Sequence, residues 1–324
     1  MKKFKSFFAS QIERYICHQK NLGYDINSKI SHLKTFDRYL VETKVDANDL
    51  YPSLLIDFRT KLRMEPQSIN GIFISLRSFF QFLVQREYYH INPFQNIPPL
   101  KTNTIFPYVF SPEEINNLLI TIRKKYFFIQ EHRLAEISIY VAILLIAKCG
   151  LRISEPLKIL VTQYRKDEGT IYIEKTKFQN DRLIPLPKDV LVEINKFIEI
   201  RNNWLEEEQK QYLFLGNKQK GLKTDQIYKV FNQIVKDIGI NQPRLITNGI
   251  TFSPPTVHSL RHSFAINILN RIKESGKSPQ KALPILTAYL GHRNIESTAK
   301  YLTMPDAQYR KNLLNFTLSH QEEI

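Results

Sequence analysis

The stretch that decides the fold of this chain runs from residue 258 to residue 265 and reads His-Ser-Leu-Arg-His-Ser-Phe-Ala. At helical spacing, His258, Arg261 and His262 share one face, because residues three and four positions apart lie above one another. Zinc proteases also place two histidines four positions apart, but they need a glutamate after the first histidine, and this chain has Ser259 there. No third metal ligand accompanies the pair, so the stretch predicts no metal site.

Working outward from this stretch, four other segments carry side chains of related chemistry. Residues 150–155 read Gly-Leu-Arg-Ile-Ser-Glu, Lys177 stands eight positions before Pro185, residues 290–292 read Leu-Gly-His, and Tyr301 follows nine positions after His292. The candidate phosphate donors are therefore Arg152, Lys177, His258, Arg261 and His292. Arginine binds phosphate oxygens through a bidentate fork, and a tyrosine among such donors is a potential nucleophile.

In order, residue type and local spacing, these segments resemble the tyrosine recombinase family of integrases and Xer-type recombinases. The resemblance covers nearly the whole chain. Residues 7–93 are similar to the family's helical core-binding domain, and residues 212–240 also follow the family pattern. Two departures are an insert around residues 273–280 and a second lysine, Lys175, which competes with Lys177.

The expected fold is mainly α-helical with a small antiparallel β-sheet. Residues 1–96 are expected to form a SAM-like helical bundle, residues 97–107 a linker, and residues 108–324 an α+β catalytic domain with a C-terminal tail. Three prolines within residues 97–107 predict that the linker holds no regular element. An apolar stripe at helical spacing, from Ile72 to Leu83, predicts a core helix and not a base-stacking platform.

Local signals place several other elements. A helix is expected from about residue 25 to residue 42, and Ser111-Pro112-Glu113-Glu114 predicts the start of another, with an N-cap, a proline in the first turn and a capping-box glutamate. Gly150 is expected to end a long apolar helix. Residues 170–173 and 182–186 read as the two strands of a hairpin.

The chain carries 46 Lys and Arg against 31 Asp and Glu, a formal net charge of +15 over 324 residues. Residues 1–104 are net +6 and residues 105–324 are net +9. A basic excess in both parts predicts that both contact one extended polyanion, with nucleic acid ahead of an anionic membrane. Candidates for DNA contacts in the first part are Lys29, Lys34, Arg38, Arg77 and Arg86.

Membrane insertion and export are not expected. The apolar run from Ile137 to Ala147 is shorter than the roughly 20 residues that a spanning helix needs, and the N-terminus lacks the apolar core of a signal peptide. The cysteines, Cys17 and Cys149, form no CxxC pair. These features predict a reduced cytoplasmic protein, which the resemblance places on the bacterial nucleoid.

The resemblance implies a reaction that uses neither a metal nor any other cofactor. Tyr301 would attack a backbone phosphate and form a 3′-phosphotyrosyl link, and two rounds of strand exchange would pass through a Holliday junction. Arg152 and Arg261 would hold the non-bridging oxygens and stabilise the transition state. Lys177 would protonate the leaving 5′ oxygen.

The remaining roles fall on the histidines and on one carboxylate. His258 is expected to accept the tyrosine proton and His292 to donate to the phosphate. Glu155 would orient Arg152 or His258 without touching the substrate, and His262 would be a packing or hydrogen-bonding residue.

The implied partners are double-stranded DNA with inverted repeats, a homotetramer of the chain on that DNA, and accessory DNA-bending proteins. Integration or excision of a mobile element is the leading expectation, at simple sites without a separate arm-binding domain. Three alternatives stay open: chromosome dimer resolution of the Xer type, a type IB-like topoisomerase, and a non-catalytic DNA-binding protein. The tail around residues 312–316 is expected to be a helix that docks on a neighbouring protomer.

Overall fold

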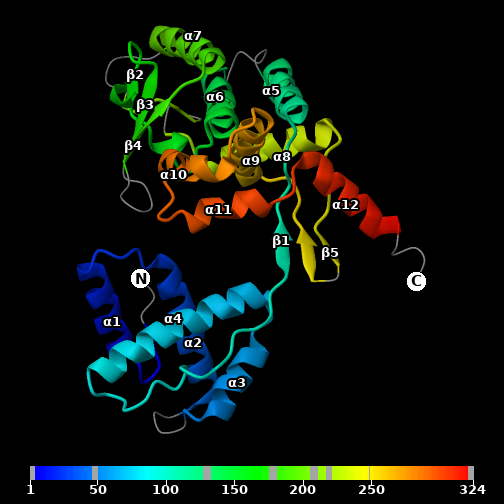
Figure 1. The fold of residues 1–324 in the computed structure, drawn as a ribbon. Helices are drawn as coiled ribbons and strands as arrows, with labels where there is room; N and C mark the ends of the chain where they lie inside the picture. The colour runs from blue at the N-terminus through cyan, green and yellow to red at the C-terminus, as the bar shows by residue number, and fades with distance from the viewer. Residues whose placement is uncertain are drawn as a thin grey trace. The chain divides into compact units, whose positions relative to one another are not determined.

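The structure, a computed structural model, describes residues 4–45, 50–126, 133–174, 181–204, 211–216, 221–247 and 249–319. Its contacts divide the chain into two units, residues 1–103 and residues 104–324. The described residues are mainly helical, and the strands form two small sheets within the second unit (Figure 1). The predicted fold class is therefore confirmed.

Unit 1 is a bundle of helices. Its helices are α1 (Ala9–Asn21), α2 (Asn27–Thr43), α3 (Pro52–Lys61) and α4 (Pro66–Gln85). Helix α4 packs against α1 and α2, and the predicted stripe along it is buried, with Leu76, Phe79, Phe80 and Leu83 each 0% exposed. Edge-to-face contacts join Phe79 and Phe80 to Phe8 of the N-terminal segment. The stripe is a core, as its spacing predicts.

The chain after α4 folds back onto unit 1. Arg77 donates from Nε to the Phe94 carbonyl (3.1 Å) and from Nη2 to the Ile97 carbonyl (3.0 Å). The Asn70 amide pairs with both backbone groups of Leu100, each at 2.8 Å. Arg77, a candidate DNA contact in the sequence, thus holds its own unit together.

The expectation that residues 97–107 hold no regular element was wrong. Residues Thr104–Phe106 form strand β1, which pairs in parallel with β6 (Ile250–Phe252), and β6 pairs antiparallel with β5 (Leu245–Thr247). The prolines flank this strand and none lies within it. Because its partner is far away in the sequence, no local pattern marks the strand.

Unit 2 is built around α6 (Arg133–Cys149). It packs against α5 (Pro112–Tyr126), α7 (Lys188–Trp204), α8 (Thr224–Asp237) and α9 (Val257–Glu274). The capping box before α5 is confirmed, because Glu114 N donates to Ser111 Oγ (3.1 Å) and Ser111 N donates to the Glu114 carboxylate (2.9 Å). Within the described ranges, no helix is long and apolar enough to cross a membrane.

The second sheet of unit 2 is antiparallel. It consists of β2 (Tyr164–Arg165), β3 (Thr170–Ile173) and β4 (Arg182–Pro185), and Ile173, the last residue of β3, pairs with Arg182, the first residue of β4. The two predicted strands are confirmed. Their alternation buries Ile171, Ile173 and Ile184 against the core around α6.

The last third of unit 2 is helical. Helices α10 (Pro279–Leu290) and α11 (Glu296–Thr303) pack on α9, and the expected insert at residues 273–280 spans the end of α9 and the start of α10. Helix α12 (Ala307–Ser319) confirms that the tail is helical. Its first turn is anchored by Arg310, which is 3% exposed and donates to the Ser253 carbonyl (2.8 Å).

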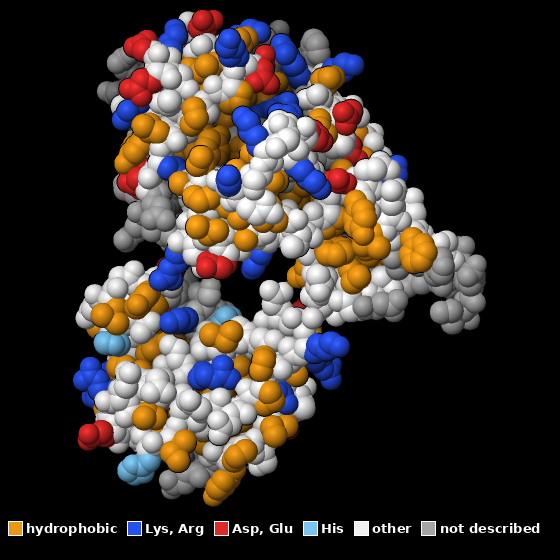
Figure 2. Space-filling model, in the orientation of Figure 1, with side chains coloured by type: hydrophobic (Ala, Val, Ile, Leu, Met, Phe, Trp, Pro, Cys, Tyr) orange, Lys and Arg blue, Asp and Glu red, His pale blue; other side chains and the backbone are white. Residues whose placement is uncertain are grey.

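Basic side chains are distributed over both units. Figure 2 shows Lys and Arg on the visible face of each unit, interspersed with other side chains. The net charge of +15 is therefore not confined to one tail.

Candidate active site

The predicted site residues of unit 2 come from five separate segments. Arg152 and Glu155 lie between α6 and the short 3-10 helix Pro156–Lys158, and His258, Arg261 and His262 lie on the first turns of α9. His292 follows α10, and Tyr301 lies on α11. Lys177 and its competitor Lys175 fall outside the described residues. The other predicted residues occupy one region of unit 2.

The start of helix α9 is fixed by a side-chain cap. Thr256 is its N-cap, and the Thr256 hydroxyl accepts a hydrogen bond from Ser259 N (3.1 Å). Such a cap satisfies one of the unpaired amides of the first turn and fixes the helical register. The register turns Arg261 into the core, where its side chain is 1% exposed, and leaves His258 at the surface.

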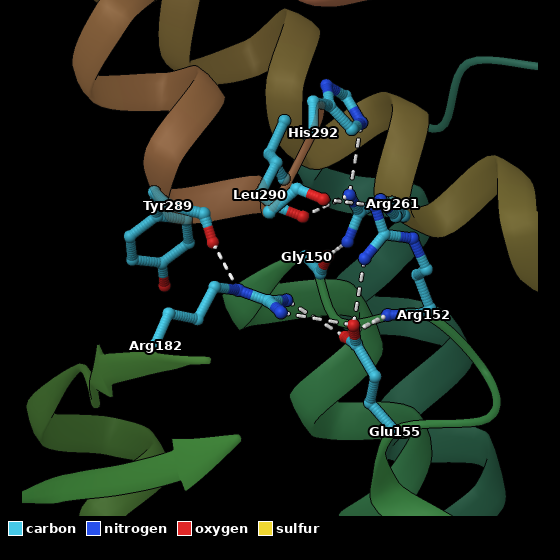
Figure 3. A network of polar contacts seen from close by, with 9 residues as sticks. Gly150, Arg152, Glu155, Arg182, Arg261, Tyr289, Leu290 and His292 are labelled. Atoms are coloured by element: carbon cyan, nitrogen blue, oxygen red, sulfur yellow. Dashed lines mark hydrogen bonds and ion pairs between the residues drawn. The ribbon is translucent and has the colours of Figure 1, made fainter. Parts of the chain in front are cut away.

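Arg261 is held by backbone carbonyls. Its Nη1 donates to the Gly150 carbonyl (2.6 Å) and its Nη2 to the Leu290 carbonyl (2.6 Å), with His292 Nε2 3.1 Å away (Figure 3). Gly150 has φ of +64°, and a Cβ there would lie 2.4 Å from the Phe264 ring. Only glycine fits both the left-handed backbone and this close approach, so the glycine before Arg152 is a packing requirement of the site.

Glu155 lies at the centre of a second group of contacts. Its carboxylate accepts from Arg152 Nη1 (3.0 Å) and from the Arg152 amide (2.8 Å). The same carboxylate accepts from Arg182 Nη1 (3.1 Å) and Nη2 (2.9 Å) in a bidentate pair. Burial would raise the pKa of Glu155, but the hydrogen bonds and charges of Arg182 and then Arg152 outweigh it and lower that pKa.

The end of α10 joins the arginines. Three successive carbonyls there accept from three different guanidinium groups: Tyr289 from Arg182 (2.7 Å), Leu290 from Arg261 (2.6 Å) and Gly291 from Arg152 (2.6 Å) (Figure 3). The last carbonyls of a helix lack intrahelical donors and carry its negative dipole end, so cations are stabilised there. Three arginines against one carboxylate leave a net charge of +2 in a mostly buried cluster.

This excess of positive charge suits a phosphate. Burial first, and then the charge of Arg152, lower the pKa of Arg261 to about 10, so Arg261 remains protonated at neutral pH. A five-coordinate phosphorus transition state carries more negative charge than the diester before it. A fixed cationic cluster therefore favours the transition state over the ground state.

Tyr301 is 6% exposed, and its hydroxyl lies 3.0 Å from His262 Nδ1. Burial raises the pKa of Tyr301, while the charges of Arg261 and Arg152 act in the opposite direction. Burial, and then the neighbouring cationic groups, lower the pKa of His262 to about 3. At neutral pH His262 is uncharged, so its Nδ1 can accept a hydrogen bond from the phenol.

Of the two histidines of α9, His262 makes a hydrogen bond, as expected for a packing or hydrogen-bonding residue, and its partner is Tyr301. His258 was expected to meet the tyrosine, but within the described residues the histidine bonded to the Tyr301 hydroxyl is His262. The His258 ring packs edge-on against the His262 ring, with centroids 4.4 Å apart. Both lie on one helix face, so only the placement of α11 decides which of them meets Tyr301.

His292 has a defined tautomer. Because arginine has no acceptor, the contact between Arg261 Nη2 and His292 Nε2 requires Nε2 to accept, and the proton lies on Nδ1. Nδ1 then donates to Thr298 Oγ1 (2.8 Å). Burial and the charges of Arg261 and Arg152 lower the pKa of His292 to about 4. The expected donation to a phosphate from Nε2 therefore requires this nitrogen to gain a proton and to leave Arg261.

Arg182 is a member of the site that the sequence did not single out. It appeared only as the first letter of Arg-Leu-Ile-Pro-Leu, yet its side chain is 7% exposed and pairs with Glu155. The available signal was strand periodicity, since Arg182 shares a face with the buried Ile184 two positions later. A buried arginine side chain needs a hydrogen-bond acceptor, and the carboxylate of Glu155 is the acceptor that pairs with Arg182.

Metal binding has no counterpart in the described part of the chain. No group of three or more His, Cys, Asp or Glu side chains there is arranged to hold a metal ion. The paired histidines of α9 contact each other and Tyr301.

Comparison with known proteins connects this site to a family. Residues 109–308 match the model of the phage integrase family. The chain is similar to y4rE, a putative integrase/recombinase of Sinorhizobium fredii, with 27% identity and 94% of each chain covered. It is also similar to the tyrosine recombinase XerD of Rickettsia bellii, with 24% identity over 96% of this chain and 99% of that protein.

Solved structures share the fold. The Tn1549 transposon integrase in complex with a circular intermediate DNA superposes with a TM-score of 0.66 and 18% identity, covering 94% of this chain and 98% of that one. A lambda integrase in a tetramer bound to a Holliday junction superposes with a TM-score of 0.64 and 16% identity, covering 94% and 79%.

Proposed function

Because this chain belongs to the phage integrase family of tyrosine recombinases, enzymes that cut and rejoin DNA strands, we propose that it recombines DNA at specific sites through a covalent link to Tyr301. The observation that carries this assignment is the position of the Tyr301 hydroxyl. It lies against a neutral histidine on α9, on the helix that also carries the buried Arg261. A nucleophile, a proton acceptor and a phosphate-binding cluster thus share one region of unit 2.

The proposed reaction conserves the energy of the phosphodiester bond. The Tyr301 oxygen attacks phosphorus and forms an O–P bond, and the bond from phosphorus to the 5′ oxygen breaks. The enzyme is then joined through the phosphate to the new 3′ end of the cut strand, and the other fragment leaves with a 5′ hydroxyl. The 5′ hydroxyl of a partner strand attacks this link and releases tyrosine, and a second round resolves the Holliday junction. No ATP is consumed, because each step exchanges one phosphodiester for another.

Arg152 and Arg261 are proposed to bind the non-bridging oxygens. Both donate to carbonyls at the end of α10, which fixes their orientation before any DNA arrives. Preorganised cations avoid the reorganisation that water would need during the reaction. Glu155 is proposed to orient Arg152, in keeping with its contacts to both the side chain and the amide of that residue.

His262 is proposed to receive the tyrosine proton, with His258 as the second candidate. Part of the depression of the His262 pKa comes from the nearby Arg261 charge. A bound phosphate offsets that charge and makes His262 a better base where the tyrosine must lose its proton. Lys177 is proposed as the acid for the leaving 5′ oxygen, on its position in the family pattern alone.

The DNA is proposed to be a duplex with inverted repeats, bound by four copies of the chain. The lambda integrase tetramer on a Holliday junction supports this assembly, and the Tn1549 transposon integrase supports a mobile element over a chromosomal role. The similarity to XerD keeps dimer resolution as the alternative. Accessory bending proteins, action in the bacterial cytoplasm and docking of α12 on a neighbour belong to the same proposal.

The test is covalent trapping on suicide DNA. The substrate is the inverted repeat that the protein protects in footprints of the DNA flanking its own gene, nicked so that the short fragment carrying the released 5′ hydroxyl diffuses away after cleavage. Wild-type protein should form an adduct that resists denaturant, and Tyr301→Phe should form none while still binding the DNA. Adduct formation by Tyr301→Phe would overturn the assignment of the nucleophile.

A second assay separates a recombinase from a topoisomerase. A recombinase should join two DNA molecules that carry the site and should act poorly on plasmid without it. Relaxation of any supercoiled plasmid with no intermolecular joining would favour the topoisomerase, and the absence of any adduct would favour a plain DNA-binding protein.

A further inference from the structure

The guanidinium of Arg182 is bound by acceptors of unit 2. Its side chain is 7% exposed, and it donates from Nε to the Tyr289 carbonyl and from both terminal nitrogens to Glu155. Three of its five N–H groups are therefore engaged by acceptors of unit 2. A guanidinium held in this way can fix the orientation of the groups that it binds, here the Glu155 carboxylate.

The bidentate pair fixes the plane of the Glu155 carboxylate. Oε1 then points to Arg152 Nη1 and Oε2 to the Arg152 amide, as Figure 3 shows. A carboxylate bound by Arg152 alone can rotate and form its own bidentate pair with Arg152. Arg182 occupies the positions that such a rearrangement needs.

The charge count leads to the same conclusion. Glu155 with Arg152 alone is a neutral pair, and a neutral pair attracts a phosphate weakly. With Arg182 present, the three groups keep one positive charge in excess. The second arginine therefore preserves the cationic character of the Arg152 position.

The loop after α10 is shaped around Arg182. A Cβ at Gly291 would lie 2.9 Å from Arg182 Nη1, and Gly291 has φ of +62°. The same residue offers its carbonyl to Arg152 (2.6 Å). One glycine thus brings Arg152 and Arg182 to the same helix end, and β4 is tied to the site through it.

We propose that Arg182 is a positioning residue of the strand-cleavage reaction, which orients and neutralises Glu155 so that Arg152 is presented to the scissile phosphate. The inference rests on the proposed function and extends it to β4, a strand that contributes no proposed contact with the reacting atoms. If it is right, loss of Arg182 should slow cleavage to an extent that depends on the charge of the phosphate, because Arg152 acts on a non-bridging oxygen.

The experiment measures single-turnover cleavage of suicide DNA by Arg182→Gln. The outer partners of functional groups typically account for a 10–100-fold effect, so cleavage at saturating DNA should slow by about that factor with DNA affinity nearly unchanged. Arg165→Gln, on strand β2 of the same sheet and paired at the surface with Glu168, is the matched control and should cleave normally. Arg182→Lys keeps the charge without the fork and should be intermediate.

A second substrate replaces one non-bridging oxygen of the scissile phosphate by methyl. This methylphosphonate carries one negative charge less, so it depends less on Arg152, and the diastereomer that best rescues Arg152→Ala is used. The defect of Arg182→Gln should shrink on this substrate. In an Arg152→Ala background, Arg182→Gln should add little.

Three results would overturn the inference: no defect on phosphate, an equal defect on both substrates, or full additivity with Arg152→Ala. Should Arg182→Gln fold poorly, Arg182→Lys carries the same comparison. Failure of the wild-type protein to form any adduct would refute the proposed function itself, a result distinct from all three.

Discussion

The arginine cluster and the tyrosine of this site are held in different ways. Arg152 and Arg182 share Glu155, and Arg152, Arg182 and Arg261 donate to three successive carbonyls at the end of α10. Tyr301 lies on the eight-residue helix α11, and its hydroxyl is contacted by His262 and by the guanidinium of Arg261. The phosphate-binding arginines thus also hold several elements of unit 2 together, whereas the nucleophile is held by packing and by the contacts of its hydroxyl. Substitutions should separate the two.

The largest expected effect on stability comes from Arg261→Ala. The change leaves the Gly150 and Leu290 carbonyls buried without their donor and opens a cavity, so unfolding should become easier by about 2–5 kcal/mol. Denaturant unfolding of unit 2, followed by hydrogen exchange, measures it. A variant as stable as wild type would show that the arginine cluster does not hold unit 2 together.

The next effect is a dependence of stability on pH. Folded pKa values of about 3 for His262 and about 4 for His292 lie below 6.5, the ordinary value for histidine. Between these values the unfolded chain binds protons that the folded chain does not. The free energy of unfolding should therefore fall as pH drops from about 6.5 to about 4. Thermal unfolding across this range measures the slope.

Variants assign the slope to residues. His262→Asn combined with His292→Asn should reduce it, because His258 and His32, whose pKa values are also lowered, still contribute. His90→Asn, an exposed position in unit 1, should leave it unchanged. An equal slope in all three proteins would place the titrating groups elsewhere.

The two histidines of α9 sharpen the account of the nucleophile. His262→Asn removes the acceptor of the Tyr301 hydroxyl and should slow cleavage by about 10²–10⁴-fold, the usual contribution of a general base. His258→Asn should have the smaller effect, because the His258 ring contacts the His262 ring, and the hydrogen bond of the Tyr301 hydroxyl is with His262. Single-turnover cleavage over pH 6–9 compares them. A reversed order would return the role of base to His258.

The smallest expected effect on stability is that of Tyr301→Phe. The contacts of the hydroxyl with His262 and Arg261 are lost but the ring still fills its place, so stability should change by only about 1 kcal/mol. Thermal unfolding measures this change beside that of Arg261→Ala. A loss as large as that of Arg261→Ala would erase the difference between the two parts of the site.

What the sequence predicted was set by local chemistry. The stripe of α4, the capping box at Ser111, the left-handed Gly150 and both hairpin strands follow from spacing and turn residues, and the structure has them. Strand β1 was missed because its partner, Ile250–Phe252, lies in a distant segment. A pairing of that kind leaves no local signal.

Within the site, the sequence identified residue types better than contacts. Arg182 was passed over because its partner, Glu155, comes from another element. His258 and His262 share one helix face, so no spacing rule distinguishes them, and the fold assigns the tyrosine contact to His262. Lys177 lies outside the described residues and stays a prediction.

The central claim is that the DNA becomes attached to Tyr301. The most direct measurement is mass spectrometry of the peptide that carries the nucleotide after nuclease and protease digestion of the trapped complex. The account predicts one modified peptide, with the phosphate on the oxygen of Tyr301. A link to any other residue, or an adduct that persists in Tyr301→Phe, would contradict it.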